Sequence, residues 1–353
     1  MASRAKKPTH VETTSADPAK TALIISGGAP NATLMAGALA AFDEKGVSFD
    51  VISTAGAGAL LGLMYCAPKS GTPRQAMESL IEMGVADPLY DKFPVNFKVF
   101  NKPGIMADLY RSALGFNPFW KAVQGWQAKD PVSQLFKDSV GLAVASTCPS
   151  DLNAKSLGLC AHVPFAEEVI DFAAIAGISP AFYVNAFNLT RKKIENFSKD
   201  IITPLHLQAS LSFPFLYPPT QVGEDWYIEG ASIDCLNFHD LLTLHPNLEQ
   251  IVVFDILGAD KLLRAPRDLY DAWVMSIITP LVEIARDDLK IFEATHLPNY
   301  PKLKDHVLRV PLLENIPAED MPDVFDWSRS NLTRLYDIGY QTAQTFVETK
   351  LSK

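Results

Sequence analysis

Two glycine-containing turns and one acidic residue are the parts of this 353-residue chain whose types and spacing could do chemistry. The turns are Ser26-Gly27-Gly28 and Thr54-Ala55-Gly56-Ala57-Gly58, and the acid is Glu229. Each turn follows a short apolar run and precedes a helical pattern, so each is expected to lead from a buried strand into a helix. A turn of this kind either binds an anion through its backbone amides or presents a side chain for attack.

The turn around Gly56 admits two interpretations. As Gly56-x-Gly58-x-x-x-Gly62 after a strand, it resembles a dinucleotide-binding loop, in which backbone amides bind a pyrophosphate. That motif also expects an acidic residue at a strand end about twenty residues later. Residues 74–83 have a helical pattern instead, and the loop follows the second strand of its unit. We therefore favour a nucleophile elbow, a sharp turn whose small residues let strand and helix pack closely.

Strands and helices alternate around these turns. A strand at Thr21–Ser26 is followed by a helix that ends near Gly46, and a strand at Phe49–Thr54 is followed by a helix from about Ala59. This βαβ order implies a parallel sheet. The further strands expected are Phe182–Phe187, Tyr227–Ile228, Ile251–Ile256 and Val307–Val310. The further helices expected are Leu269–His296, which Pro280 kinks or divides, and a closing helix from about Ser328.

The turn at Gly56 and the upstream glycine turn together resemble the patatin-like phospholipases. The family's pattern of a strand, Gly-x-Ser-x-Gly and Ala-Leu aligns without a gap with Asp50–Leu60, which places its serine on Gly56. Its glycine-rich oxyanion loop aligns with Gly27, Gly28 and Ala29, although alanine replaces the third glycine. The basic residue that usually follows is Asn31.

A third block extends the resemblance to the family's catalytic acid. The segment Ala209–Pro219 resembles the Ser-x-x-x-Pro and Pro stretch that leads to the family's Asp-Gly-Ala, and the aspartate falls on Glu229. The resemblance implies an α/β fold of three layers (α/β/α), with a mostly parallel central sheet and helices on both faces. It covers one domain, residues 21–353.

In the family, serine attacks an acyl ester, aspartate acts as its base, and amides of the glycine loop hold the oxyanion. One lost oxyanion donor costs roughly 10²–10³ in rate. Glycine has no nucleophilic atom, so the acyl-enzyme route is closed at Gly56. Glu229 keeps a carboxylate but adds a methylene, and a shift of about 1 Å costs on the order of 10²-fold. It could instead position a water for direct attack. The neighbouring hydroxyl and thiol residues are expected to be structural: Ser53, Thr54, Cys66, Ser210 and Ser212.

Composition excludes several classes of function. The net charge of −9 disfavours nucleic acid as a partner, because phosphate binding needs clustered cations. The cysteines form no CxxC pair and the histidines no HExxH motif, so neither a metal nor another cofactor is expected, and reduced thiols fit a cytoplasmic protein. Residues 1–20 are expected to form a disordered tail. No apolar run reaches the ~18 residues that span a bilayer, so membrane contact would be peripheral.

Residues 85–150 are expected to form an aromatic-rich insertion or lid subdomain. The segment Phe93–Trp126 mixes aromatic residues with lysine, which suits peripheral contact with a membrane or a cover over an apolar pocket. An extra subdomain with its own small core is the other interpretation.

The altered motifs predict a catalytically impaired or inactive member of the family that binds lipid or acyl chains. One alternative is an active lipid acyl-ester hydrolase, either through different chemistry or because Gly56 is an engineered replacement of serine. A second alternative is a non-catalytic scaffold or interaction subunit that uses the aromatic segment.

Overall fold

The computed structural model describes residues 20–28, 31–128, 130–162, 166–321, 323 and 325–351. Of the predicted tail, only Lys20 lies in these ranges, and its backbone N–H donates to the carboxylate of Asp50 at 2.8 Å. The rest of that tail lies outside the described residues, as does Ala29 of the predicted oxyanion loop.

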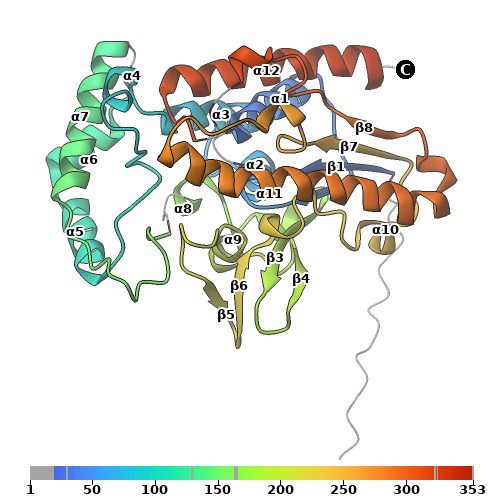
Figure 1. Cartoon of the computed structure of the whole chain (residues 1–353), viewed down its shortest axis with the longest axis horizontal. Helices are drawn as coiled ribbons and strands as arrows, with labels where there is room; N and C mark the ends of the chain where they lie inside the picture. The colour runs from blue at the N-terminus through green and yellow to red at the C-terminus, as the bar shows by residue number, and fades with distance from the viewer. Residues whose placement is uncertain are drawn as a thin grey trace, which may run out of the picture.

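Within the described ranges, an eight-stranded mixed sheet forms the centre of the molecule (Figure 1). The strand order is β5-β6-β3-β2-β1-β7-β8, and β4 pairs with β3 outside this path. The five strands from β3 to β8 in this order pair in parallel, whereas β4, β5 and β6 pair antiparallel. The strands are β1 (Thr21–Ile25), β2 (Val51–Thr54), β3 (Ala181–Asn188), β4 (Lys193–Ser198), β5 (Thr220–Val222), β6 (Asp225–Glu229), β7 (Gln250–Phe254) and β8 (Val307–Arg309).

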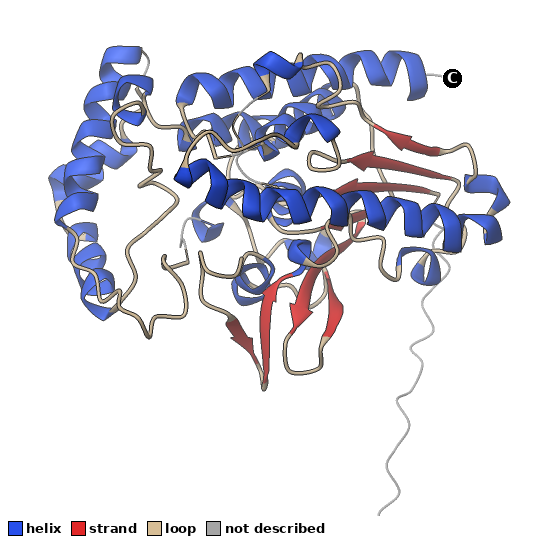
Figure 2. Cartoon of the chain, viewed as in Figure 1, coloured by secondary structure: helices blue, strands red, loops and turns tan. Residues whose placement is uncertain are grey.

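Helices cover the two faces of the sheet, so the predicted layered α/β fold is confirmed (Figure 2). The helices around the sheet are α1 (Ala32–Glu44), α2 (Ala57–Cys66), α3 (Pro73–Ser79), α9 (Pro204–Ser210), α10 (Leu241–Leu244), α11 (Leu269–Ile291) and α12 (Arg329–Phe346). Alternate residues of β1 belong to different cores, because successive side chains of a strand point to opposite faces. Leu23 and Ile25 pack with residues of α1, α2 and α12, whereas Ala22 and Ile24 pack with α10 and Phe292, just after α11.

Several predicted boundaries need correction: β1 ends at Ile25 rather than Ser26, β2 begins at Val51 rather than Phe49, and β8 ends at Arg309 rather than Val310. Strand β7 ends at Phe254 rather than Ile256, because the carboxylate of Asp255 accepts the N–H groups of Leu257 and Gly258 and turns the chain. Helix α11 is continuous through Pro280, so no second segment begins there, and a π-helical turn follows it at Phe292–His296.

The insertion predicted at residues 85–150 consists mainly of helices that stand together at one end of the molecule (Figure 1). These are α4 (Asp87–Tyr90), α5 (Ile105–Gly115), α6 (Pro118–Gly125) and α7 (Pro131–Thr147), and α8 (Ala166–Val169) follows the insertion. The buried residues of α5, α6 and α7 are Ala107, Val123, Gln134 and Asp138. The small apolar core expected of an extra subdomain is therefore not found within these three helices.

Candidate active site

Gly56 occupies the tip of a sharp turn between β2 and α2. Its backbone angles are φ 49° and ψ −126°, a region that residues with a β-carbon rarely adopt. Gly58 follows at the first turn of α2, where a β-carbon would overlap the carbonyl oxygens of Ile25 and Ser26. The turn therefore has the geometry of a nucleophile elbow, as predicted. Residues 74–83 are helical (α3 and a 3₁₀ turn), which is inconsistent with a dinucleotide loop.

The carboxyl group of Glu229 fills the space beside Gly56 that a side chain would occupy. A β-carbon built on Gly56 would overlap Oε1 of Glu229, and would lie 3.1 Å from the carboxyl carbon of Glu229 and 3.0 Å from the β-carbon of Ala231. Glu229 ends β6, and its backbone N–H donates to the carbonyl of Ser212 at 3.0 Å. The structure thus brings together the two positions that the sequence assigned to the nucleophile and the acid.

Burial controls the charge of Glu229. Removal of its carboxyl from water raises the pKa of Glu229 to about 8, because the ionised form is poorly solvated there. None of the described residues donates a hydrogen bond to this carboxyl, and no charged neighbour offsets the burial. The side chain keeps partial contact with the adjoining cavity and is otherwise surrounded by protein. At pH 7 it is mainly the neutral acid, which can donate a proton in a hydrogen bond.

The predicted oxyanion loop adjoins this carboxyl. Gly28 has φ +118°, a conformation that favours glycine, and the N–H of Gly27 donates to the carbonyl of Cys235 at 3.4 Å. No described residue accepts a hydrogen bond from the backbone N–H of Gly28 or of Ala57, the residue after Gly56. Both residues line the cavity next to Glu229. Asn31 stands where the family has a basic residue, but it is fully buried, and its side-chain amide has no hydrogen-bond partner among the described residues.

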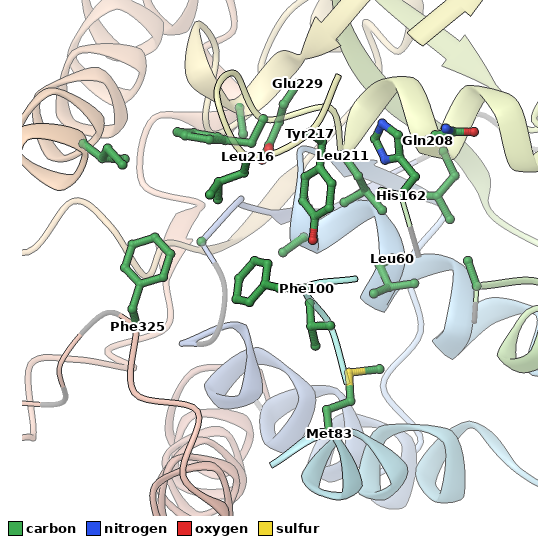
Figure 3. Close-up of a pocket in the computed structure, with 18 of the residues that line it drawn as sticks. Leu60, Met83, Phe100, His162, Gln208, Leu211, Leu216, Tyr217, Glu229 and Phe325 are labelled. Carbon is green, nitrogen blue, oxygen red and sulfur yellow. The ribbon is translucent and has the colours of Figure 1, made fainter. Parts of the chain in front are cut away.

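A cavity of about 380 Å³ lies above the elbow (Figure 3). In Figure 3 the labelled side chains surround it, with Glu229 and Tyr217 on one side and Met83 on the opposite side. Most of the lining is apolar and comes from α2, α9, α11 and the segment before α5. The apolar side chains include Leu60, Met83, Val99, Phe100, Leu207, Leu211, Leu216, Leu257, Ile277, Ile278, Leu281 and Phe325. The polar lining side chains among the described residues that carry a titratable group are His162, Glu167, Tyr217 and Glu229.

A serine and a histidine meet beside the cavity, a pair that the sequence did not reveal. Nε2 of His162 lies 3.2 Å from Oγ of Ser212 and 3.1 Å from the carbonyl oxygen of Pro218, and its ring stacks on Tyr217 at 4.9 Å. Ser212 is fully buried, and its hydroxyl donates to the carbonyl of Gln208 at 2.8 Å. A hydroxyl so placed cannot reach a substrate, so Ser212 is structural, as expected.

The other candidate nucleophiles are either held in structural contacts or buried. The hydroxyl of Ser53 donates to the carbonyl of Asn237 at 2.9 Å, and that of Thr54 to the carbonyl of Tyr183 at 2.8 Å. Burial raises the pKa of the Cys66 thiol to about 12, which suppresses the reactive thiolate. Ser210 is fully buried at the end of α9, and its hydroxyl has no hydrogen-bond partner in the part of the chain that the structure describes.

The family model described as "Patatin-like phospholipase" matches residues 23–242, more than half of the chain. The chain belongs to this family. The match covers the elbow, the glycine loop and Glu229, which are the parts that form the site. No curated protein sequence matches the chain.

Several solved structures, one of them a phospholipase, are similar to this chain at low identity. VipD from Legionella pneumophila shares 14% identity over 95% of this chain and 68% of its own, with a TM-score of 0.39. Human GIVD cytosolic phospholipase A2, solved with methyl gamma-linolenyl fluorophosphonate, shares 12% identity over 93% and 58%, with a TM-score of 0.37. ExoU in complex with SpcU from Pseudomonas aeruginosa shares 14% sequence identity over 95% of this chain and 52% of its own, with a TM-score of 0.34. The chain therefore spans little more than half of the last two proteins.

Two kinds of feature are absent from the described residues of this patatin-like protein. No group of three or more His, Cys, Asp or Glu side chains in those ranges is arranged to hold a metal ion. Among the same residues, no helix combines the length and the apolar character needed to cross a membrane.

Proposed function

We propose that this patatin-like protein binds acyl chains in the cavity above Gly56 and does not hydrolyse esters through the family's dyad. The observation that carries the proposal is the position of the Glu229 carboxyl, which fills the space of the missing nucleophile. A neutral, buried acid is also a poor general base, because a base must be deprotonated at the working pH. The acid of the dyad has thereby become part of the cavity wall.

The cavity supports the binding half of this proposal. A pocket of a few hundred Å³ with mainly apolar walls and a few converging polar groups is typical of small-molecule sites. None of the described lining residues is lysine or arginine, so a phosphate or nucleotide has no cation to pair with inside it. An alkyl chain gains about 0.8 kcal/mol for each CH₂ group that it removes from water.

The binding test uses a variant that fills the cavity. Leu60→Trp should reduce the affinity for a fluorescent acyl probe such as cis-parinaric acid by about tenfold or more, because Leu60 lines the cavity from α2. The matched control is Leu205→Trp, since Leu205 lies on α9 but is exposed and does not line the cavity. Circular dichroism checks that both variants fold. If neither variant changes the affinity, the probe binds elsewhere and the proposal is wrong.

The catalytic test is a direct assay of ester hydrolysis with short and long acyl esters. We expect no turnover above that of the uncatalysed reaction. Activity that disappears in Glu229→Gln would instead support the alternative in which Glu229 positions a water for direct attack. Activity that survives Glu229→Gln would contradict the proposal that the protein does not hydrolyse esters, and it would also exclude the mechanism in which Glu229 positions a water.

We further propose that the helices α5, α6 and α7 make peripheral contact with a membrane. Large apolar side chains on these helices face solvent: Phe116 is 85% exposed, Val132 76%, Ile105 74% and Phe119 64%. Exposed apolar patches of this kind mark binding surfaces for lipids or proteins. The insertion also forms part of the cavity wall, because Val99 and Phe100 line the cavity. The ring of Phe100 lies 6.5 Å from the ring of Tyr217. A surface that binds a protein partner would make the chain a scaffold subunit instead, and the vesicle experiment below separates the two.

A further inference from the structure

We infer that the cavity selects an unesterified fatty acid, whose carboxylate pairs with the Glu229 carboxyl and with the backbone N–H groups of Gly28 and Ala57. This inference rests on the proposed function and names the chemical class of its ligand. It depends on two features of one end of the cavity: among the described residues, nothing donates a hydrogen bond to the Glu229 carboxyl, and nothing accepts one from the amides of Gly28 and Ala57.

The donors at this end of the cavity match a carboxylate. No described residue accepts a hydrogen bond from the amides of Gly28 and Ala57, and both residues line the cavity. Glu229 lies between the two turns that carry them, because its Oε1 is 3.8 Å from the position of a β-carbon on Gly27 and overlaps that position on Gly56. The neutral carboxyl adds an O–H donor to the two N–H donors. A group with two acceptor oxygens satisfies more of these donors than a group with one.

An ester satisfies the same donors less well. Its carbonyl oxygen forms neutral hydrogen bonds, whereas a carboxylate forms charge-assisted bonds that are roughly twice as strong. Two carboxyl groups in contact cannot both be ionised, so the pair shares one proton. Neutral Glu229 contributes the shared proton, and the fatty acid binds as its anion, so no proton is taken up from solvent or released to it. An ester must also find room for its alcohol beside Gly56, where Glu229 and Ala231 already lie.

The other titratable groups around this end do not replace Glu229. Tyr217, on the loop before β5, faces Glu229, but burial raises the pKa of its hydroxyl far above neutrality. His162 stacks on Tyr217, and burial lowers the pKa of its imidazole, so it is neutral at pH 7 and above. Glu167 on α8 is exposed, and Gly28, Ala57 and Ala231 carry no titratable side chain. Asp234, whose pKa burial raises to about 7, does not line the cavity, so Glu229 is the described lining side chain whose charge changes most between pH 7 and pH 9.5.

The test compares cis-parinaric acid with its methyl ester on the delipidated full-length protein, by fluorescence titration. At pH 7 we expect the acid to bind about tenfold more tightly than the ester. From pH 7 to pH 9.5 the affinity for the acid should fall by at least about tenfold, since Glu229 loses its proton, while that for the ester changes little. Glu229→Leu should abolish the preference for the acid. Glu229→Gln still donates and should bind the acid without the loss at high pH, and Glu224→Gln on the exposed β5–β6 turn should behave as wild type.

The outcomes separate this inference from the proposed function. If acid and ester bind equally in the wild type, the head-group inference is overturned and acyl binding stands. If the preference for the acid persists in Glu229→Leu, the carboxylate lies elsewhere and the inference is also overturned. If neither probe binds, the proposed function itself fails.

Discussion

The carboxyl group of Glu229 and a side chain at position 56 exclude each other. A β-carbon on Gly56 would overlap Oε1 of Glu229 and lie 3.1 Å from its carboxyl carbon. Glycine at position 56 and glutamate at position 229 are therefore a structurally matched pair, and the shorter aspartate of the family would leave room for serine. This relationship predicts how the two positions respond to substitution together.

Gly56→Ser should destabilise the protein by about 1–3 kcal/mol through backbone strain alone, because φ at Gly56 is +49°. Displacement of the Glu229 carboxyl should lower the free energy of unfolding by roughly 1 kcal/mol more. Gly56→Ser combined with Glu229→Asp should recover this second part and should show esterase activity. Urea denaturation measures the free energies of unfolding, and hydrolysis of a p-nitrophenyl ester measures the activity.

The control for this experiment is Gly46→Ser, at another glycine with positive φ (+68°) that has no atom within 4 Å of an added β-carbon. Its stability should be independent of the residue at position 229. If Glu229→Asp changed the cost of Gly46→Ser as much as that of Gly56→Ser, Gly56 and Glu229 would not be a structurally matched pair. A folded double variant without activity would show that the amides of Gly28 and Ala57 do not form an oxyanion hole.

Glu229 should also shape the dependence of stability on pH. In the folded chain burial raises the pKa of Glu229 to about 8, from 4.5 for an isolated side chain. Between these values the folded state binds more protons than the unfolded state, so the free energy of unfolding falls as pH rises. The slope is at most about 1.4 kcal/mol per pH unit. Glu229→Gln removes this contribution and should gain stability relative to wild type from about pH 5 to pH 8.

Chemical denaturation at several pH values measures this difference. Burial raises the pKa of Asp234 to about 7 and that of Asp288 to about 6, so these groups give a similar dependence in both proteins and cancel in the comparison. Below pH 4.5 the difference should no longer change with pH, since Glu229 is protonated in both states. A difference that stays constant from pH 5 to pH 8 would mean that the carboxyl of Glu229 is ionised in the folded protein.

The elbow and its partners were predictable because their signals are local. A strand, two glycines and an apolar helix specify the turn at Gly56, and the same kind of pattern specifies the turn at Gly27 and Gly28. The alignment of Glu229 with the family's aspartate assigns the acid to a residue that lies beside Gly56 in the structure. The sequence could not show that the Glu229 carboxyl fills the space beside Gly56, because that depends on side-chain packing between β6 and the elbow.

Two other features escaped prediction for the same physical reason. His162 meets Ser212 only through the fold, and a single histidine without a spaced partner carries no recognisable pattern. The sequence pattern predicts one aromatic unit, but the structure divides it: Phe100 packs against Trp327 and lines the cavity, whereas Phe116 is exposed to solvent. The periodicity of a helix shows which face is apolar, but not whether anything covers that face.

Close packing of α1 against α12 predicts a large effect of one methyl group. A β-carbon on Gly339 would overlap the carbonyl oxygen of Leu34, and one on Gly37 would lie 2.8 Å from the backbone nitrogen of Tyr340. The backbones must move apart to admit a side chain, so Gly339→Ala should destabilise the protein by about 3 kcal/mol or more. Gly115→Ala in α5 is the control, because its β-carbon meets nothing within 4 Å. That change should be neutral or stabilise by up to about 1 kcal/mol, as measured by urea denaturation.

Removal of exposed aromatic residues from the insertion should weaken binding to anionic vesicles. The helices α5 and α6 and the turn between them combine the exposed rings of Phe116 and Phe119 with the exposed cation of Lys121, whereas Arg111 is paired with Asp108. Aromatic rings with a cation suit a negatively charged bilayer surface. Phe116→Ser with Phe119→Ser should lower the partition coefficient, measured by sedimentation with phosphatidylserine-containing vesicles, by about tenfold or more, because two aromatic side chains leave the apolar region.

Trp226→Ser is the control, because Trp226 is also exposed but lies on β6, away from these helices. Binding should decrease with rising salt, since cations near the surface contribute about 1 kcal/mol each and are screened within about 10 Å at 0.1 M. Equal losses for Trp226→Ser and the double variant would mean that the bilayer contact is not made by α5 and α6. Wild-type protein that does not bind vesicles at all would leave a protein partner as the occupant of this surface, and the membrane proposal would be wrong.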